Sequence, residues 1–382
     1  MWVVGLVITL LAILALTVFL LAPRTPRPAG LRDRTDLAAY LETVAKSGAA
    51  PSVSVAVMRN NAVLWEHAVG TANLLAQRPA HTDTRYHWWS VTKVATALTV
   101  LGLVDDGVID LDTEVAMLLP FFQVAGLETG SHPITIRHLL NHTSGLPDPI
   151  PAMFGWVRYD RQGPDQTAFL QEHFQGFCSL RFQPGSDRRY SNLGFMVLGA
   201  VIEKVTGQQF EDAVAARVFG PAGMTSSGFV FDEDHDSEAL GSHPVSHVFT
   251  PLLPFYLGLG DLVAARRGTT LWFNRFYINA APPTGLIGTA RDVARLGQAA
   301  MRPDVILQVE TLDLMMPDDD SPSLGWSEKG HEWYQHRGGG PGYAAILRIY
   351  PQEGLSIAVV GNGTALEVET IADAIHNVEM TR

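Results

Sequence analysis

The sequence is poor in cysteine and in metal-binding patterns. Among its 382 residues only Cys178 carries a thiol, and a single cysteine excludes an intrachain disulfide, a cysteine-based zinc site and a CxxC redox pair. The 13 histidines do not form an HExxH or similar array, which argues against a metallohydrolase. We therefore expect a protein that works without a metal ion or an organic cofactor.

Positive charge is scarce as well. Lysine and arginine together number 27, against 39 aspartates and glutamates, and the formal net charge is −12. An acidic balance of this kind does not attract a polyanion, so we expect no nucleic-acid partner. Because 47% of the residues are hydrophobic and only 17% are charged, the composition indicates a folded chain with a packed core.

One long hydrophobic run is present, at the N-terminus. Residues 2–22 contain no charged side chain and would span about 31 Å as a helix, enough for one bilayer crossing. A cleaved signal peptide is the alternative, but no A-x-A site follows the run, and Pro23 stands where cleavage would occur. We predict an uncleaved transmembrane anchor over residues 1–22, followed by a linker over residues 23–34.

From residue 35 to residue 382 the pattern predicts one domain with two parts. Helix and strand signals cluster at its two ends: a helix that follows Asp36 and runs to about Lys46, strands over 52–58 and 62–69, strands over 331–337, 343–350 and 355–360, and a helix over 366–380. Helical signals dominate in between, up to about residue 315. We expect an α/β part, an antiparallel sheet flanked by terminal helices, from about 35–89 and 326–382, with an all-α part inserted at about 90–325.

Ser90 and Lys93 stand at the start of a predicted helix. Their spacing of three residues places both side chains on one helical face, so the amine can reach the hydroxyl. A serine hydroxyl is a poor nucleophile at neutral pH, and a desolvated lysine with a lowered pKa is one recognised base for it. Because an accidental S-x-x-K has odds of roughly one in four in a chain with so few lysines, this pair alone is weak evidence.

Two further segments carry groups suited to acyl transfer. In a Tyr-Ser-Asn triplet, Tyr190 can take and return a proton, and the Asn192 amide can orient a lysine and a substrate carbonyl. The alternative is that the triplet only caps the next helix. His336, Gly338 and Gly339 lie at the end of a predicted strand, where glycines allow a substrate to approach and expose an N–H to an oxyanion. A plain glycine-rich turn is the alternative there.

These three elements, in this order, resemble the motifs of the serine β-lactamase and penicillin-binding-protein superfamily, in particular the class C β-lactamase-related serine hydrolases. Residues 139–148 resemble that family's LLxHTSGLPD signature, residues 182–224 follow its PG…YSN…LG…TG…P-x-GM block, and residues 284–292 resemble its GGLxSTAxD segment. The resemblance covers most of residues 36–382. It implies a β-lactamase/transpeptidase-like fold.

The resemblance also implies a role for each matching residue. Ser90 would be the acylated nucleophile, Lys93 its activating partner, and Tyr190 the general base or proton shuttle. Asn192 would orient the substrate, and the backbone amides of Ser90 and Gly339 would form the oxyanion hole. The HTSGLPD loop is structural in this family.

His336 departs from the penicillin-recognising pattern, because many members carry the lysine of a KTG motif at this position. Alternation along a strand lets His336 and Gly338 face the cleft while Arg337 points away. A histidine of ordinary pKa is mostly neutral above about pH 7 and gains charge toward about pH 6. We therefore expect poor recognition of a β-lactam carboxylate, with β-lactam turnover improving relative to ester turnover as the pH falls.

Together these features predict a serine hydrolase that cleaves an ester or amide through a Ser90 acyl-enzyme, most similar to the family's esterases. One alternative is a D-alanyl peptidase or weak β-lactamase acting on cell-wall-related substrates. Another is a non-catalytic cell-envelope binding protein of the same fold. The expected partners are a small-molecule, ester or peptide substrate and the membrane.

The arginines after the hydrophobic run bear on which side of the membrane the domain lies. Four arginines stand between the hydrophobic run and the domain, and by the positive-inside rule they place the domain in the cytoplasm. Long domains, however, are translocated largely regardless of nearby charge. Because family members of this kind work outside the cytoplasm, we expect a single-pass anchor with an extracytoplasmic domain.

Residues 248–277 are unusually apolar and aromatic. They are expected to pack in the core, with a lid or acyl pocket as the alternative.

Overall fold

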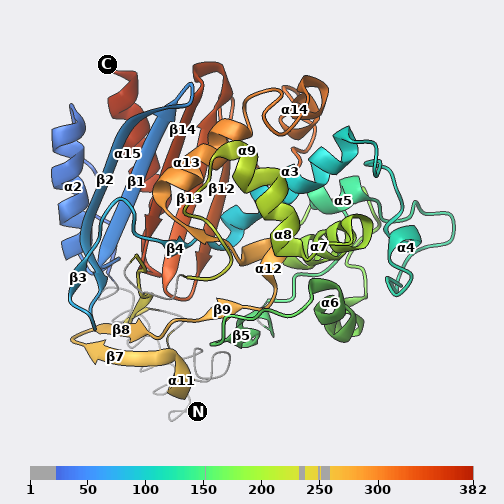
Figure 1. The fold of residues 1–382 in the computed structure, drawn as a ribbon, viewed down its shortest axis with the longest axis horizontal. Helices are drawn as coiled ribbons and strands as arrows, with labels where there is room; N and C mark the ends of the chain where they lie inside the picture. The colour runs from blue at the N-terminus through green and yellow to red at the C-terminus, as the bar shows by residue number, and fades with distance from the viewer. Residues whose placement is uncertain (1–22, 151, 232–236, 248–249, 251–258, 382) are drawn as a thin grey trace, which may run out of the picture.

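The computed structural model describes residues 23–150, 152–231, 237–247, 250 and 259–381 (Figure 1). The predicted transmembrane anchor over residues 1–22 lies outside this set, as do residues 248–249 and 251–258 of the aromatic stretch. Within the described residues, no helix is both long enough and apolar enough to cross a bilayer.

A seven-stranded antiparallel sheet forms the α/β part (Figure 1). Its strand order is β11-β12-β13-β14-β1-β2-β3, so strands from both ends of the chain meet where β1 pairs with β14. The bounds are β1 (Ser52–Arg59), β2 (Ala62–Asn73), β3 (Arg78–Pro79), β11 (Glu328–Lys329), β12 (Tyr334–Gly340), β13 (Tyr343–Tyr350) and β14 (Leu355–Gly361). The structure thereby confirms the predicted antiparallel sheet.

The central strands of this sheet are buried on both faces. All 8 residues of β13 are buried, and alternate residues along the strands belong to two different hydrophobic clusters. Leu347 and Val360 pack into the cluster shared with the helical part, whereas Ile346 and Val359 pack into a second cluster. Burial on both faces explains why these segments are nearly continuous apolar runs.

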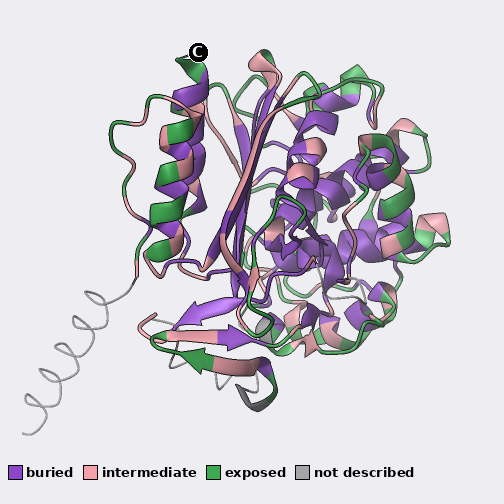
Figure 2. Cartoon of the chain, turned by 60° about the vertical axis from the view of Figure 1, so that its left-hand side comes forward, coloured by how far each residue is buried: buried purple, intermediate pink, exposed green. Residues whose placement is uncertain are grey.

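Two terminal helices cover the second cluster. α2 (Arg34–Lys46) and α15 (Val368–Met380) supply its helical residues, and Figure 2 shows their buried sides turned toward the sheet. The helix was predicted to follow Asp36, but it begins earlier because Asp33 caps it, accepting the backbone N–H of Asp36 at 3.0 Å. Arg34 joins the two helices by donating to both carboxylate oxygens of Glu379 at 2.8 Å.

Helices dominate the inserted region, as predicted. α3 (Thr92–Asp105) and α7 (Asn192–Thr206) pack against each other and are buried over most of their length. The shorter helices of this region are α4 (Val115–Leu118), α5 (Ile136–Leu140), α6 (Gln166–Phe174), α8 (Phe210–Val214), α9 (Gly220–Ala222), α11 (Leu259–Leu262), α12 (Ala281–Thr284) and α14 (Val309–Met315).

The inserted region also contains strands that the sequence did not predict. A three-stranded sheet is formed by β6 (Ser242–Pro244), β7 (Val263–Arg267) and β8 (Thr270–Phe273), and a strand pair by β5 (Val157–Arg158) and β9 (Tyr277–Ile278). A second pair joins β10 (Ile287–Gly288) to β4 (Tyr86–His87), which lies just before the inserted region. Strands this short carry too little alternation to be recognised. Phe273, Phe276 and Tyr277 are at most 1% exposed, which agrees with core packing for the described part of the aromatic stretch.

One helix of the inserted region lies against the large sheet. α13 (Ala290–Ala299) packs on β1 and β14. Its Gln298 donates hydrogen bonds to the carbonyl oxygens of Met58 at 3.3 Å and Gly354 at 3.0 Å. Residues before 326 therefore contribute to the sheet layer, because α13 covers a face of the sheet that the terminal helices leave free.

Candidate active site

Ser90 lies in a tight turn that leads into α3. The turn is a short 3-10 helix (Trp89–Val91) that continues directly as α3. Trp89 has a φ of 47°, a left-handed conformation that bulky residues rarely adopt. Such strained residues persist only where the surrounding packing holds them, and they cluster at functional sites. Here the Trp89 side chain is 1% exposed, so packing holds the turn in place.

Glycines of β12 allow the strand to approach this turn closely. A Cβ atom at Gly338 would lie 1.9 Å from the carbonyl oxygen of Trp88 and 3.1 Å from the Ser90 nitrogen, whereas one at Gly339 would meet nothing within 4 Å. Burial alternates along the strand, with His336 and Gly338 buried and Arg337 and Gly339 exposed. The predicted alternation is confirmed, and these glycines belong to the strand rather than to a plain turn.

Lys93 is fully buried beside Ser90. Its Nζ atom lies 3.3 Å from Ser90 Oγ, 2.7 Å from Asn192 Oδ1 and 3.0 Å from the carbonyl oxygen of Pro283. Burial lowers the pKa of Lys93 well below its usual value, and the negative charge of Asp148 opposes this. A neutral amine has two N–H bonds, and here they donate to Asn192 Oδ1 and to the Pro283 carbonyl oxygen. Its lone pair is then left for the proton of the Ser90 hydroxyl.

Asn192 is positioned by the start of α7. Ser191 caps the helix, since its Oγ accepts the Gly194 backbone N–H at 3.2 Å. Because Ser191 is the capping residue, the Asn192 side chain is available for other contacts. Its Oδ1 accepts a hydrogen bond from Lys93 of α3, and its Nδ2 donates to Asp148 Oδ1 at 3.1 Å. Asp148 was not predicted as a site residue, although it ends the HTSGLPD motif. Only the fold shows that it holds Asn192.

Tyr190 closes the site beside Lys93. The Nζ atom of Lys93 lies 4.9 Å from the centroid of the Tyr190 ring. Although 38% of the residue is exposed, desolvation raises the pKa of the Tyr190 hydroxyl, and a hydrogen bond with Ser90 only partly opposes the rise. The phenol is therefore protonated at neutral pH. Because it lies beside the Ser90 hydroxyl, it can donate a proton to a group that reacts there.

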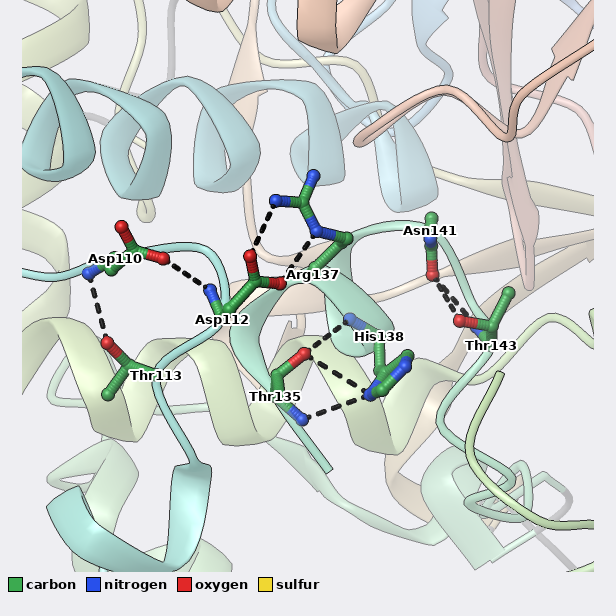
Figure 3. Close-up of polar contacts among 8 residues, drawn as sticks. All are labelled: Asp110, Asp112, Thr113, Thr135, Arg137, His138, Asn141 and Thr143. Carbon is green, nitrogen blue, oxygen red and sulfur yellow. Dashed lines mark hydrogen bonds and ion pairs between the residues drawn. The ribbon is translucent and has the colours of Figure 1, made fainter. Parts of the chain in front are cut away.

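The loop that follows α5 is held by its own polar side chains (Figure 3). Asn141 Oδ1 accepts hydrogen bonds from the backbone N–H of Thr143 at 3.1 Å and from its hydroxyl at 2.6 Å. Arg137 of α5 donates to Asp112 at 2.9 Å. These contacts fix the start of the loop, where His142 takes a left-handed φ of 63°.

His142 lies against Tyr190, a position that sequence reasoning did not assign. The two ring centroids are 4.6 Å apart, and His142 Nδ1 accepts the Ser191 backbone N–H at 3.3 Å. Burial, with a smaller contribution from the charge of Lys93, lowers the pKa of His142. The neutral ring thus supports Tyr190 and the residue after it, which agrees with a structural role for this loop.

His336 is buried, although it was expected to face the cleft with an ordinary pKa. It is 1% exposed, and its Nδ1 lies 2.8 Å from the carbonyl oxygen of Arg337, which assigns the ring proton to Nδ1. Burial, followed by the charge of Lys93, lowers the pKa of His336 to about 3. The expectation that this ring gains charge toward pH 6 is therefore wrong.

The preference for esters over β-lactams is consequently expected to stay constant between about pH 8 and about pH 6, because a His336 ring with a pKa of about 3 is neutral throughout. The measurement is kcat/KM for p-nitrophenyl butyrate and for nitrocefin at both pH values. The contrary result is a kcat/KM for nitrocefin that rises toward pH 6 relative to that for the ester, together with loss of this rise in His336→Asn. It would show that the His336 ring titrates near its ordinary pKa.

The structure brings together the residues predicted from three separate segments. They surround the Ser90 turn and comprise Ser90, Lys93, Tyr190, Asn192, His336, Gly338 and Gly339. Within the described part of the chain, no group of three or more His, Cys, Asp or Glu side chains is arranged to hold a metal ion. A serine and a tyrosine beside a buried lysine form an arrangement that is suited to nucleophilic catalysis.

Known proteins resemble the chain over most of its length. A family model described as Beta-lactamase matches residues 37–379. Penicillin-binding protein 4* of Bacillus subtilis is 27% identical over 308 residues, which are 75% of this chain and 63% of that protein. Penicillin-binding protein 4 of Amycolatopsis lactamdurans is 30% identical over 304 residues, 74% of this chain and 73% of that protein. Esterase EstB of Burkholderia gladioli is 44% identical over 185 residues, 46% of each chain.

Solved structures share the fold at lower sequence identity. The octameric penicillin-binding protein homologue from Pyrococcus abyssi has a TM-score of 0.72 and 22% identity, covering 92% of this chain and 78% of that one. D-amino acid amidase from Ochrobactrum anthropi, solved with L-phenylalanine, has a TM-score of 0.71 and 20% identity, covering 91% of this chain and 99% of that one. Both confirm the predicted β-lactamase/transpeptidase-like fold.

Proposed function

The chain belongs to the Beta-lactamase family, and from that premise we propose that it is a serine hydrolase that cleaves esters or amides through an acyl-enzyme on Ser90. A shared fold does not establish an activity, so the proposal depends on the site itself. The observation that carries it is the position of Lys93 Nζ, 3.3 Å from Ser90 Oγ with two carbonyl oxygens accepting its other hydrogen bonds.

The proposed acylation step uses neutral groups. Ser90 Oγ attacks the substrate carbonyl carbon while its proton passes to the Lys93 amine, and the backbone N–H groups of Ser90 and Gly339 stabilise the oxyanion. Tyr190 gives its proton to the leaving oxygen or nitrogen as the bond to it breaks, and Lys93 returns a proton to Tyr190. In deacylation, water attacks the acyl carbon and the transfers run in reverse, which restores the Ser90 hydroxyl.

Ester hydrolysis is the reaction we propose first. The neutral His336 offers no cation for a β-lactam or D-alanyl carboxylate, and the similarity to esterase EstB supports the same assignment. A D-amino-acid-specific amidase is the second candidate, supported by D-aminopeptidase of Brucella ovis, which is 29% identical over 232 residues. A non-catalytic binding protein has no need of the buried lysine that contacts Ser90.

A fluorophosphonate probe is expected to label Ser90 covalently, since the Lys93 and Tyr190 side chains both contact its hydroxyl. The measurement is the intact mass of the purified protein after labelling, compared with Ser90→Ala. Equal labelling of both proteins, or labelling of neither, would remove the nucleophile assignment and favour a binding protein. Panels of p-nitrophenyl esters and D-amino-acid amides then separate the two candidate activities.

We also propose that residues 1–22 anchor the protein in a membrane as a single pass, with the domain on the extracytoplasmic side. The support is the uncharged run over residues 2–22. The linker that follows is partly docked on the domain, because the Thr25 hydroxyl accepts the Glu367 backbone N–H at 2.8 Å and Tyr40 donates to the Pro26 carbonyl oxygen at 2.7 Å.

The full-length protein is expected to sediment with membranes and to remain there at high salt, because burial of an apolar span does not depend on charge. A chain that begins at Pro23 keeps the docked linker and is expected to be soluble. Extraction of the full-length protein by salt alone contradicts the anchor. Protease added to intact cells tests the orientation, and a fully protected domain would place it in the cytoplasm.

A further inference from the structure

A cavity of about 710 Å³ adjoins the candidate active site along β12. Tyr190, His336, Gly338 and Gly339 line it on the side of Ser90, and the first turn of α15 lines it on the other. We call it the β12–α15 cavity. A substrate held at Ser90 along β12 would extend part of its length into this space.

The charged residues that line this cavity are predominantly acidic. Within the described lining there are three carboxylates, Glu328, Glu367 and Glu369, and one guanidinium, Arg337, which gives a net charge of −2. Arg337 pairs with Glu328 at 3.3 Å and with Glu369 at 3.2 Å. Gln335 donates to the same two carboxylates at 2.8 and 2.9 Å. The cation is thus already paired, and the cavity keeps an excess of negative charge.

The charge of Arg188 and the N-terminus of α15 do not reverse this excess. Arg188 donates to the carbonyl oxygens of Trp326 and Ser327 at 3.2 Å each, and counting it leaves the sum negative. The N-terminus of α15 carries a partial positive charge, but Glu367 and Glu369 stand at its first turn, and the Glu367 N–H is already bound by Thr25.

His336, one of the lining residues, also has a polar ring atom without a partner in the described part of the chain. His336 lines the cavity, is 1% exposed, and its Nε2 has no hydrogen-bond partner among the described residues. Because Nδ1 carries the ring proton, Nε2 presents a lone pair, which accepts hydrogen bonds and attracts positive charge. This acceptor and the carboxylates favour the same kind of ligand group.

We propose that the β12–α15 cavity binds a cationic group of the substrate, so that the preferred substrates are esters or amides that carry an ammonium or quaternary ammonium group. This inference rests on the proposed hydrolase function and specifies its substrate class. Partly exposed ion pairs are individually weak, so each carboxylate is expected to contribute about threefold in kcat/KM. A substrate carboxylate is disfavoured by the same charges.

Two pairs of esters of equal shape test the proposal. Butyrylcholine and 3,3-dimethylbutyl butyrate differ only by a charged nitrogen in the leaving group, and the p-nitrophenyl esters of 4-(trimethylammonio)butanoate and 5,5-dimethylhexanoate differ likewise in the acyl group. In at least one pair, the cationic ester is expected to have about a tenfold higher kcat/KM at low salt. The ratio is expected to fall at about 0.5 M salt, which screens partly exposed charges.

Charge-removing variants assign the effect to this cavity. Glu367→Gln and Glu369→Gln are each expected to lower the ratio of cationic to neutral turnover about threefold. Glu310→Gln, at an exposed position on α14 outside the cavity, makes the same change in net charge and is expected to leave the ratio unaltered.

The outcomes separate this inference from the proposed function. Equal turnover within both pairs, by a protein whose Ser90 is labelled by the fluorophosphonate, overturns the cationic preference alone. A preference that Glu367→Gln and Glu369→Gln leave unchanged overturns its assignment to this cavity. Absence of both turnover and labelling overturns the hydrolase function itself.

Discussion

Replacing Lys93 with methionine is expected to lower kcat/KM for p-nitrophenyl butyrate by at least about four orders of magnitude, as when one member of a proton-transfer unit is removed. Methionine fills a similar buried volume but has no lone pair for the Ser90 proton. It also removes the hydrogen bonds that Lys93 Nζ donates to Asn192 Oδ1 at 2.7 Å and to the Pro283 carbonyl oxygen at 3.0 Å. The serine hydroxyl then remains in place without its base.

The pH profile distinguishes loss of a base from loss of packing. In the unaltered protein kcat/KM is expected to rise with pH through the lowered pKa of Lys93, because only the neutral amine accepts a proton. Residual activity of Lys93→Met should lack this rise. Lys204→Met, at an exposed position near the end of α7, is the matched control. A folded Lys93→Met protein that keeps more than about a tenth of the activity would assign the base to another group.

Much of the fold could be predicted because its signals are local. The strand over residues 343–350 is observed with the predicted bounds, since a proline and a glycine delimit the turn that follows it. Alternation along β12 correctly separated His336 and Gly338 from Arg337. The position of α13 on the sheet was not predictable in this way, because it depends on a face of the sheet formed by residues far away in sequence.

In the candidate site, too, local features could be predicted and contacts between distant segments could not. The spacing of Ser90 and Lys93 follows from one turn of helix, and their contact could be predicted. The burial of His336 could not, since the groups that enclose it and lower its pKa come from other segments. The contact of Asp148 with Asn192 joins residues 44 apart in sequence, so only the packing of the loop against α7 reveals it.

Replacing Gly338 with alanine is expected to lower kcat/KM at least about a hundredfold, the usual cost of misplacing a reacting group by about 1 Å. The new Cβ would lie 1.9 Å from the Trp88 carbonyl oxygen and 3.1 Å from the Ser90 nitrogen. Both are backbone atoms, so β12 or the Ser90 turn has to move. Either movement displaces the nucleophile relative to the backbone N–H of Gly339, which is proposed to hold the oxyanion.

The same substitution is expected to cost about 1–3 kcal/mol of stability, as overpacking does. Gly339→Ala is the matched control for the melting temperature in calorimetry, because its Cβ would meet no atom within 4 Å. Gly176→Ala, which is equally unobstructed and lies outside the site, is the control for activity measured well below the melting temperature. If Gly338→Ala matches both controls, close approach of β12 to the Ser90 turn is not required.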